Sequence, residues 1–234
     1  MNEAATNWDM IEELWQQRHD PARLAEFAVI LEQAGRQNSE LAYPRLWRAA
    51  RLAHFRAMQA DEEAGPPSIV KGHYEAGAEQ ALRALQSDGT RVEGHFWHGV
   101  NLIEAARRQG WLAGARALPV AMRHIERAVA MDEEYHFGGP VRVWARLTHL
   151  RPLVLGGSLD RALDIYRRAL QIAPHNSTNL LYYAEGLIAD QQRPPAREAL
   201  RQIIDADDDP AWRWEQARDR RLAAALLKSI ELGK

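Results

Sequence analysis

The stretch SLDRALDIYRRALQIAP, residues 158–174, carries the pattern that decides the fold. Within it, Ala162, Tyr166 and Ala169 are spaced i, i+4 and i+7, and Pro174 follows shortly after them. This spacing puts the three side chains on one face of a helix, where small residues let a neighbouring helix approach closely. Because Ser158 is a good N-cap and proline ends helices, we predict a helix over residues 159–172.

The same spacing recurs three more times along the chain. One further copy begins at Ala196, and two upstream copies begin at Ala121 and Gly77. The interval from Ala162 to Ala196 equals the period of the tetratricopeptide repeat, a pair of antiparallel helices, and the longer upstream intervals imply insertions. A matching small residue occupies the first helix of three predicted pairs, at Gly99, Ala145 and Ala184.

Capping residues predict the limits of about eleven helices. The sequence shows no alternation of apolar and polar residues of the kind that would predict β-strands instead. Asp20 before Pro21, and Asp209 before Pro210, place an N-cap acceptor in front of a proline at the first helical position. The predicted helices span 5–17, 21–35, 40–60, 70–87, 91–108, 117–131, 140–154, 159–172, 176–190, 194–206 and 210–231. The predicted fold is all-α, a right-handed superhelix of antiparallel helical hairpins that resembles tetratricopeptide-repeat proteins.

We predict one helical-repeat domain over residues 1–234. Residues 1–69 form divergent N-terminal hairpins, 70–207 the repeat-like core, and 208–234 a C-terminal capping helix of the kind that repeat arrays require. The segment 61–70, with Gly65-Pro66-Pro67, is the most loop-like stretch and is interpreted as an insertion within this domain.

The composition excludes several functional classes. Acidic and basic residues nearly cancel, with a net charge of −2, so no global field attracts a polyanion and we expect no nucleic-acid partner. No cysteine is present, and no apolar stretch is long enough to cross a bilayer, so we expect no thiolate site and no membrane span. As the sequence stands we expect a cytoplasmic protein, and a periplasmic one if a leader or lipobox was removed.

Beyond the clear repeat helix, several segments follow one another in a recognisable order. They are EGHFWHGVNL at 93–102, MDEEYHFGGPVRVWARL at 131–147 and the turn at 152–157. Over residues 93–207 this order resembles the T-component family of TRAP transporters, tetratricopeptide-like proteins also called TatT. The resemblance implies a scaffold, often lipid-anchored and periplasmic, that associates with the solute-binding subunit and can form a homo-oligomer. The sequence as given shows neither a signal peptide nor a lipobox cysteine, so we expect either a cut N-terminus or a relative of the family that stays in the cytoplasm.

The repeat geometry also predicts a partner-binding groove. In a tetratricopeptide-like superhelix the first helices line the concave side, and the residues three before and one after the small position point inward. Large aromatic residues adjoin these positions on two of the helices. The resulting set is Phe96, Trp97, Val100, Arg142, Arg146, Leu181, Tyr182 and Glu185.

These residues favour a non-catalytic scaffold that binds a protein partner. The resemblance to the T-component family implies the solute-binding subunit as the specific candidate. Two arginines beside apolar side chains suit a carboxylate next to a hydrophobic group. We expect that replacing Arg142 and Arg146 with alanine weakens binding and leaves the fold nearly unchanged. The alternative is a carrier of a small hydrophobic or anionic ligand in the same groove.

Two other constellations have a functional and a structural interpretation. His95 and His98 are spaced i, i+3 and can share a helix face, but zinc usually needs a third ligand. The sequence alone does not place His73, His124 or His136 near them. Gly138-Gly139-Pro140 before Arg142 could present backbone N–H groups to an anion, or could form a tight turn, which we favour. Because no nucleotide-binding or hydrolase motif occurs, we expect no metal, no cofactor and no catalytic residue.

Overall fold

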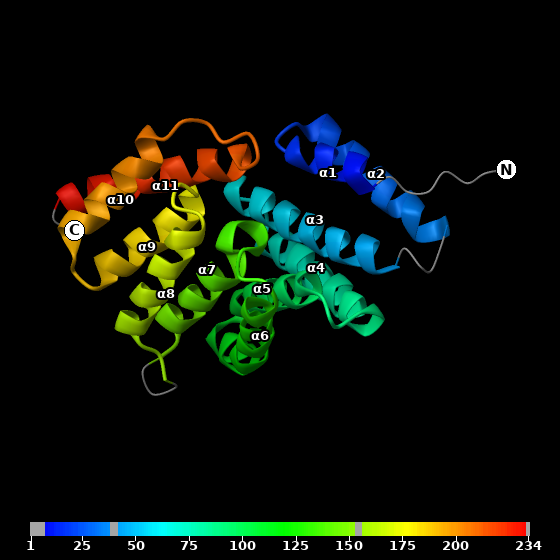
Figure 1. Ribbon diagram of the computed structural model, residues 1–234, viewed down its shortest axis with the longest axis horizontal. Helices are drawn as coiled ribbons and strands as arrows, with labels where there is room; N and C mark the ends of the chain where they lie inside the picture. Colours follow the sequence, from blue (N-terminus) through cyan, green and yellow to red (C-terminus); the bar gives the residue numbers. More distant parts are fainter. Residues whose placement is uncertain (1–7, 38–41, 153–155, 233–234) are drawn as a thin grey trace. The chain divides into compact units, whose positions relative to one another are not determined.

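The computed structural model describes residues 8–37, 42–152 and 156–232, and within these ranges the chain forms helices and turns without a strand. The described residues form eleven helices, which Figure 1 labels in chain order, and this confirms the predicted all-α class for the described part of the chain. Their bounds are α1 (Trp8–Gln16), α2 (Pro21–Gln37), α3 (Ala42–Glu62), α4 (Pro67–Ser87), α5 (Val92–Gln109), α6 (Trp111–Met131), α7 (Tyr135–Leu150), α8 (Leu159–Ile172), α9 (Ser177–Ala189), α10 (Arg193–Asp205) and α11 (Arg213–Glu231).

The chain divides into two compact units at the turn after α6. Unit 1 is residues 1–131 and holds α1 to α6, whereas unit 2 is residues 132–234 and holds α7 to α11. Each unit is a stack of helices packed mainly on their neighbours in sequence, as the short connections between them require. We describe each unit by itself.

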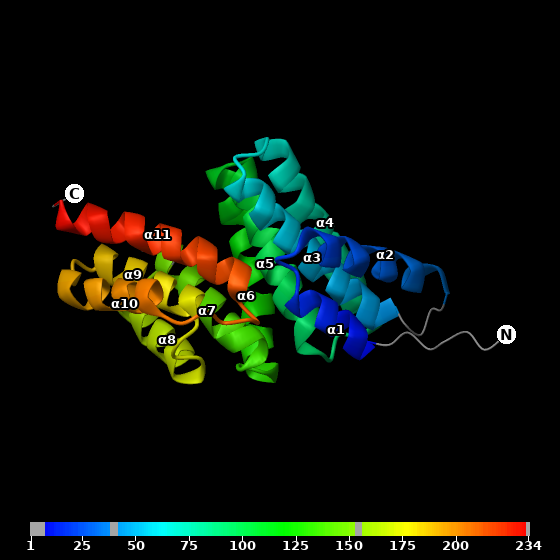
Figure 2. The same cartoon turned by 90° about the horizontal axis from the view of Figure 1, so that it is seen from above.

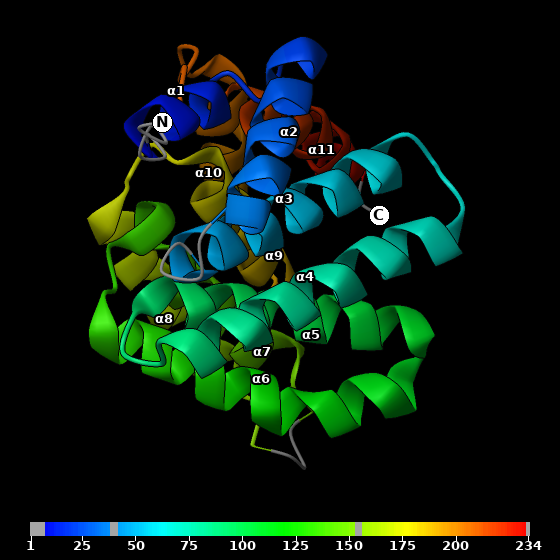
Figure 3. The same ribbon diagram turned by 90° about the vertical axis from the view of Figure 1, so that its right-hand side faces the viewer.

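Unit 1 is built around the hairpins α3–α4 and α5–α6. Consecutive helices pack on one another from α1 through α6, and α3 also packs directly on α5. Figure 3 shows α3, α4, α5 and α6 side by side in chain order. Helices α3 and α5 are the first helices of successive hairpins. Because they contact each other directly, they form one layer, which is the arrangement of helical repeats.

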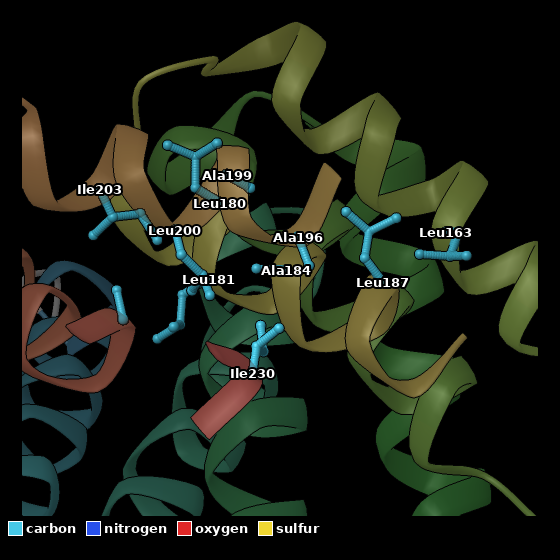
Figure 4. Packing of buried hydrophobic residues seen from close by; sticks show 11 residues of the cluster. Leu163, Leu180, Leu181, Ala184, Leu187, Ala196, Ala199, Leu200, Ile203 and Ile230 are labelled. Carbon is cyan, nitrogen blue, oxygen red and sulfur yellow. The ribbon is translucent and has the colours of Figure 1, made fainter. Parts of the chain in front are cut away.

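Unit 2 repeats this two-layer arrangement. Helix α9 packs on α7 and α11 in one layer, and α8 and α10 pack between them in the other (Figures 1 and 2). The core lies between the layers and contains Leu181 and Leu187 of α9 and Leu200 and Ile203 of α10, with Ile230 of α11 covering one side (Figure 4). The C-terminal helix α11 therefore packs on the last hairpin and covers part of its core.

The small and aromatic positions of the repeat pattern are confirmed as packing residues. All twelve residues of the four copies are buried, and the small residues of the first helices are buried beside them. At Gly99 a Cβ atom would lie 2.9 Å from the Ile125 side chain and 3.2 Å from the Ala121 carbonyl oxygen. Only glycine lets α5 approach α6 this closely.

Two of the predicted caps are confirmed. The Asp20 carboxylate accepts a hydrogen bond from the backbone N–H of Ala22 at 2.8 Å, and the Ser158 hydroxyl accepts one from Arg161 at 3.3 Å. The cap predicted at Asp209 is wrong. Its carboxylate accepts from the N–H of Ala211 in a turn, and α11 begins only at Arg213. The Gln216 side chain accepts from the Asp209 N–H at 2.8 Å and holds this turn.

Some predicted limits differ because a proline does not always end a helix. Helix α6 begins at Trp111, ahead of the predicted start at residue 117, and continues through Pro119. The proline costs the helix one backbone hydrogen bond, which packing of α6 against α5 outweighs. Helix α4 begins at Pro67, so the expected loop at 61–70 shrinks to a turn around Gly65. Predicted helix limits at 5–7, 40–41, 153–154 and at Gly233 lie outside the described residues.

Candidate functional site

The three predicted groove residues of unit 1 lie in the interior of α5. Phe96, Trp97 and Val100 are buried, and the rings of Phe96 and Trp97 meet edge to face with centroids 4.8 Å apart. The Trp97 ring also contacts His54 of α3. In the structure these side chains pack α5 against its neighbours, and little of their surface is accessible to a partner.

The predicted residues of unit 2 gather where α7 meets α9. Leu181 is part of the core, whereas Arg142 is a buried cation, 5% exposed, that donates a hydrogen bond to the Asn179 side-chain oxygen at 2.7 Å. Burial lowers the pKa of Arg142 to about 10, so the guanidinium is still charged at neutral pH. Arg142 is thus held in place by the fold.

Arg146, Tyr182 and Glu185 form a second, more accessible group one turn further along. Arg146 and Glu185 make an ion pair between α7 and α9, with 24% and 27% of their side chains exposed. The Arg146 guanidinium lies over the Tyr182 ring at 4.7 Å. Burial acts to lower the pKa of Arg146, but the Glu185 carboxylate and neighbouring phenols outweigh it, so the pKa is raised.

Helix α11 adds a buried carboxylate to the same layer. Asp219 is fully buried and accepts hydrogen bonds from the hydroxyls of Ser177 at 2.7 Å and Thr178 at 2.6 Å, at the start of α9. It also pairs with Arg218 at 2.6 Å. Burial would lower the pKa of Arg218, and the neighbouring Asp219 raises it above its ordinary value instead.

These side chains form one connected group on the layer of α7, α9 and α11, which we call the unit 2 polar cluster. Tyr182 interacts electrostatically with all three of its arginines. The cluster offers fixed cations, carboxylates and a phenol, groups that can form ion pairs and charge-assisted hydrogen bonds with a bound molecule. Its members are Arg142, Arg146, Asn179, Tyr182, Glu185, Arg218 and Asp219.

A left-handed turn leads into this cluster. His136, Phe137 and Gly138 have φ angles of 53°, 60° and 74°, which is strained for the two residues that carry a Cβ. The Phe137 carbonyl accepts a hydrogen bond from the Asn179 side-chain amide at 3.1 Å, and its ring lies against Trp212 with centroids 5.2 Å apart. The predicted turn at Gly138-Gly139-Pro140 is confirmed, and it begins at His136, ahead of the glycines.

Three histidines of unit 1 come together although the sequence linked only two of them. The Nδ1 atoms of His95 and His124 lie 2.9 Å apart, and the rings of His98 and His124 are 4.6 Å apart. Burial is the main cause that lowers the pKa of each of the three. Across the described part of the chain, no group of three or more histidine or carboxylate side chains is arranged to hold a metal ion.

The comparison with protein families decides the identity of this scaffold. The model of the TRAP transporter T-component family matches residues 21–231. The chain belongs to this family. The match covers both units of this T-component and extends well beyond residues 93–207, the part that carries the resemblance in the sequence. Among curated protein sequences, no significant match is found.

Two solved tetratricopeptide-repeat structures are similar to this T-component, and the first supports its fold. A thermophilic tetratricopeptide-repeat protein of Thermus thermophilus is similar with a TM-score of 0.50 and 16% identity, over 76% of this chain and 90% of that one. YrrB, a tetratricopeptide-repeat protein with an unusual peptide-binding site, is similar with a TM-score of 0.47 and 18% identity, over 96% of this chain and 100% of that one. At such identities the similarity concerns the fold alone.

Sequence reasoning missed several residues that the structure places in the cluster of this T-component. Asn179 and Asp219 each bind two or more partners, but polar residues in a helix sequence are ordinarily interpreted as exposed. Contacts with other helices hold both side chains, and such contacts leave no spacing pattern in the sequence. Among the described helices of this T-component, none combines the length and the apolar character needed to cross a bilayer.

Proposed function

We propose that this T-component is a non-catalytic helical scaffold that binds a protein partner through the unit 2 polar cluster. Its specific role is that of an accessory subunit of a TRAP-type solute transporter, and the partner is the solute-binding subunit. Membership of the T-component family supports the transporter role, and the described chemistry supports binding without catalysis.

The choice of surface rests on the partly exposed group Arg146, Tyr182 and Glu185. An aromatic ring flanked by a cation and a carboxylate provides both apolar contact area and charge-assisted hydrogen bonds. Buried neighbours on α7, α9 and α11 hold this group in place, so binding a partner costs little side-chain ordering. Tyrosine and arginine are among the residue types that most often dominate the energy of interfaces.

A charge exchange across the ion pair tests this proposal. The double variant Arg146→Glu with Glu185→Arg keeps an ion pair between α7 and α9 and reverses its direction. We expect the affinity for the solute-binding subunit, measured by calorimetry, to fall at least about tenfold, because a complementary partner then meets like charges. The melting temperature should change little.

The matched control is Arg193→Glu, an exposed change at the start of α10 in the other layer. It should leave the affinity unaltered. Equal affinities for the wild type and the exchanged variant, with both melting normally, would show that the partner binds elsewhere. If the exchanged pair does not fold, the single variant Glu185→Gln gives the same comparison.

A carrier of a small hydrophobic or anionic ligand remains the alternative role. It is favoured if calorimetry detects a small anion at the cluster while the solute-binding subunit does not bind. Homo-oligomer formation, the cytoplasmic or periplasmic location, and the absence of enzymatic activity stay predictions. Light scattering, fractionation and activity screening test them separately.

A further inference from the structure

Unit 1 contains a small cavity at the junction of α1, α3 and the start of α5, remote in sequence from the proposed partner site. Its volume is about 250 Å³. Trp8, Pro44 and Trp47 supply apolar lining, and Arg48, Arg91 and Glu93 supply charge. A few convergent polar groups in an otherwise apolar hollow are typical of sites for small molecules.

The aromatic part of the cavity is rigid because Arg48 is fixed against two indole rings. Its guanidinium lies 4.1 Å from the Trp47 ring centre and 4.6 Å from that of Trp8. The Arg48 Nε atom donates to the Glu12 carboxylate at 2.7 Å, and one terminal nitrogen donates to the Pro44 carbonyl at 3.1 Å. The indole faces and the guanidinium thus form a preorganised wall.

The charged side chains that line the cavity give it a positive balance. Two of them, Arg48 and Arg91, are cations, and Glu93 is an anion. Arg48 shares the carboxylate of Glu12 with Arg51, which lies 2.9 Å from it, and Arg91 pairs with Glu93 at 3.3 Å. This balance favours an anionic ligand over a neutral or cationic one.

Glu93 is already engaged by groups other than Arg91. It accepts a hydrogen bond from the Tyr43 hydroxyl at 3.1 Å, and burial together with the Glu93 charge raises the pKa of Tyr43, so the phenol stays a donor. The Arg91 side chain is 50% exposed, and the distance from its terminal nitrogen to the Glu93 carboxylate is longer than in a strong ion pair. The Arg91 guanidinium also lies 4.9 Å from the Tyr43 ring centre, so an incoming carboxylate has to replace only the weak pair with Glu93.

We propose that this cavity binds a small organic carboxylate that carries one aromatic ring. The ring packs against Trp8, Trp47 and Pro44, and the carboxylate pairs with Arg91 at the rim. The volume lies just below the range of pockets for drug-sized ligands, which limits the occupant to about one ring and a short chain. This inference is independent of the partner-binding function assigned to unit 2.

Titration calorimetry with 3-phenylpropionate tests the proposal on the full chain. We expect a dissociation constant between about 10 µM and about 1 mM, as for a ligand of this size with one ion pair. The uncharged 3-phenylpropanol and the cationic 3-phenylpropylamine should bind at least about tenfold more weakly, since neither pairs with Arg91. Comparable affinity for the amine would overturn the proposal.

Two variants locate the site. Arg91→Gln should weaken 3-phenylpropionate about tenfold and keep the melting temperature, because the side chain is half exposed. Arg116→Gln, an exposed arginine on α6 outside the cavity, is the matched control and should bind like the wild type. The assignment is contradicted if both variants lose the same affinity for 3-phenylpropionate, or if Arg91→Gln binds it as tightly as the wild type. It is also contradicted if the wild type shows no heat of binding at millimolar ligand.

Discussion

At the scale of single residues, the fold depends on small side chains that stand opposite large ones. In α8 the fully buried Tyr166 shares a helix face with Ala162 and Ala169, which are fully buried too. Protein interiors are packed as densely as organic crystals, so these positions tolerate changes in volume poorly. The same relation holds at Gly99, where Ile125 fills the space that a side chain would need.

Replacing Ala162 with tryptophan tests this packing. The variant should lose about 1–3 kcal/mol of unfolding free energy, because the indole overpacks the contact between α8 and its neighbours. Urea denaturation followed by circular dichroism measures the loss. Ala130→Trp, at an exposed position near the end of α6, is the control and should change the midpoint little. If the two variants unfold alike, Ala162 does not occupy a close contact.

Arg142 is the residue for which the structure changes the sequence-based expectation most. Arg142→Ala removes the donor to Asn179 and opens a cavity, so we expect a loss of about 2–4 kcal/mol of unfolding free energy. The partly exposed Arg146→Ala should cost under about 1 kcal/mol. Thermal melts of both single variants distinguish the two roles, and equal midpoints would contradict the buried hydrogen bond.

At the scale of helices, the spacing of small residues predicted where the helices lie. Prolines and capping residues predicted the helix ends less well. The i, i+4, i+7 spacing depends only on helix periodicity, which is a local property, and all four copies are buried. Ends depend on competing contacts. Pro119 lies inside α6 because packing against α5 continues through it, and Asp209 caps a turn because Gln216 folds back onto it.

The site was less predictable than the helices for the same physical reason. The repeat rule identifies a helix face, but it does not state how deeply that face is covered. At the position one after the small residue, Val100 is buried, whereas Arg146 and Glu185 are partly exposed. Asn179 acts through contacts with other helices, and such contacts leave no spacing pattern in the sequence.

The stability of the folded protein should depend on pH through His95 and His98 of α5 and His124 of α6. Burial and then the neighbouring histidines lower the pKa of His124 to about 4. The unfolded chain, with an ordinary histidine pKa of about 6.5, therefore binds more protons than the folded one between about pH 6.5 and about pH 4. Stability is fully present above this window and falls as the pH decreases through it.

Melting curves at pH 7.5 and pH 5.0 measure this effect. The unfolding free energy should be lower at pH 5.0 than at pH 7.5. We expect His124→Gln to reduce this difference in unfolding free energy by on the order of 1–2 kcal/mol, after allowing for the partial exposure of the side chain. His175→Gln, an exposed change before α9, should leave the difference as it is. A pH dependence that is the same in the wild type and His124→Gln would exclude the histidine cluster as its origin.

At the scale of the whole molecule, the fold and the family are established and the function rests on the placement of one binding surface. The family match spans both units, yet the unit 2 polar cluster draws its residues from three helices, and its first and last members in the sequence are Arg142 and Asp219. Such a surface exists only in the folded unit, which is why a sequence pattern could name its helices but not its boundary.

Amide hydrogen exchange of the full chain, with and without the solute-binding subunit that we propose as its partner, tests the partner-binding claim most directly. We predict slower exchange confined to peptides from α7, α9 and the first half of α11, where Arg146, Tyr182, Glu185 and Arg218 lie. Peptides from α8 and α10 should exchange at the same rate in both samples. Protection confined to α8, α10 or unit 1, or no protection at saturating partner, would contradict the account.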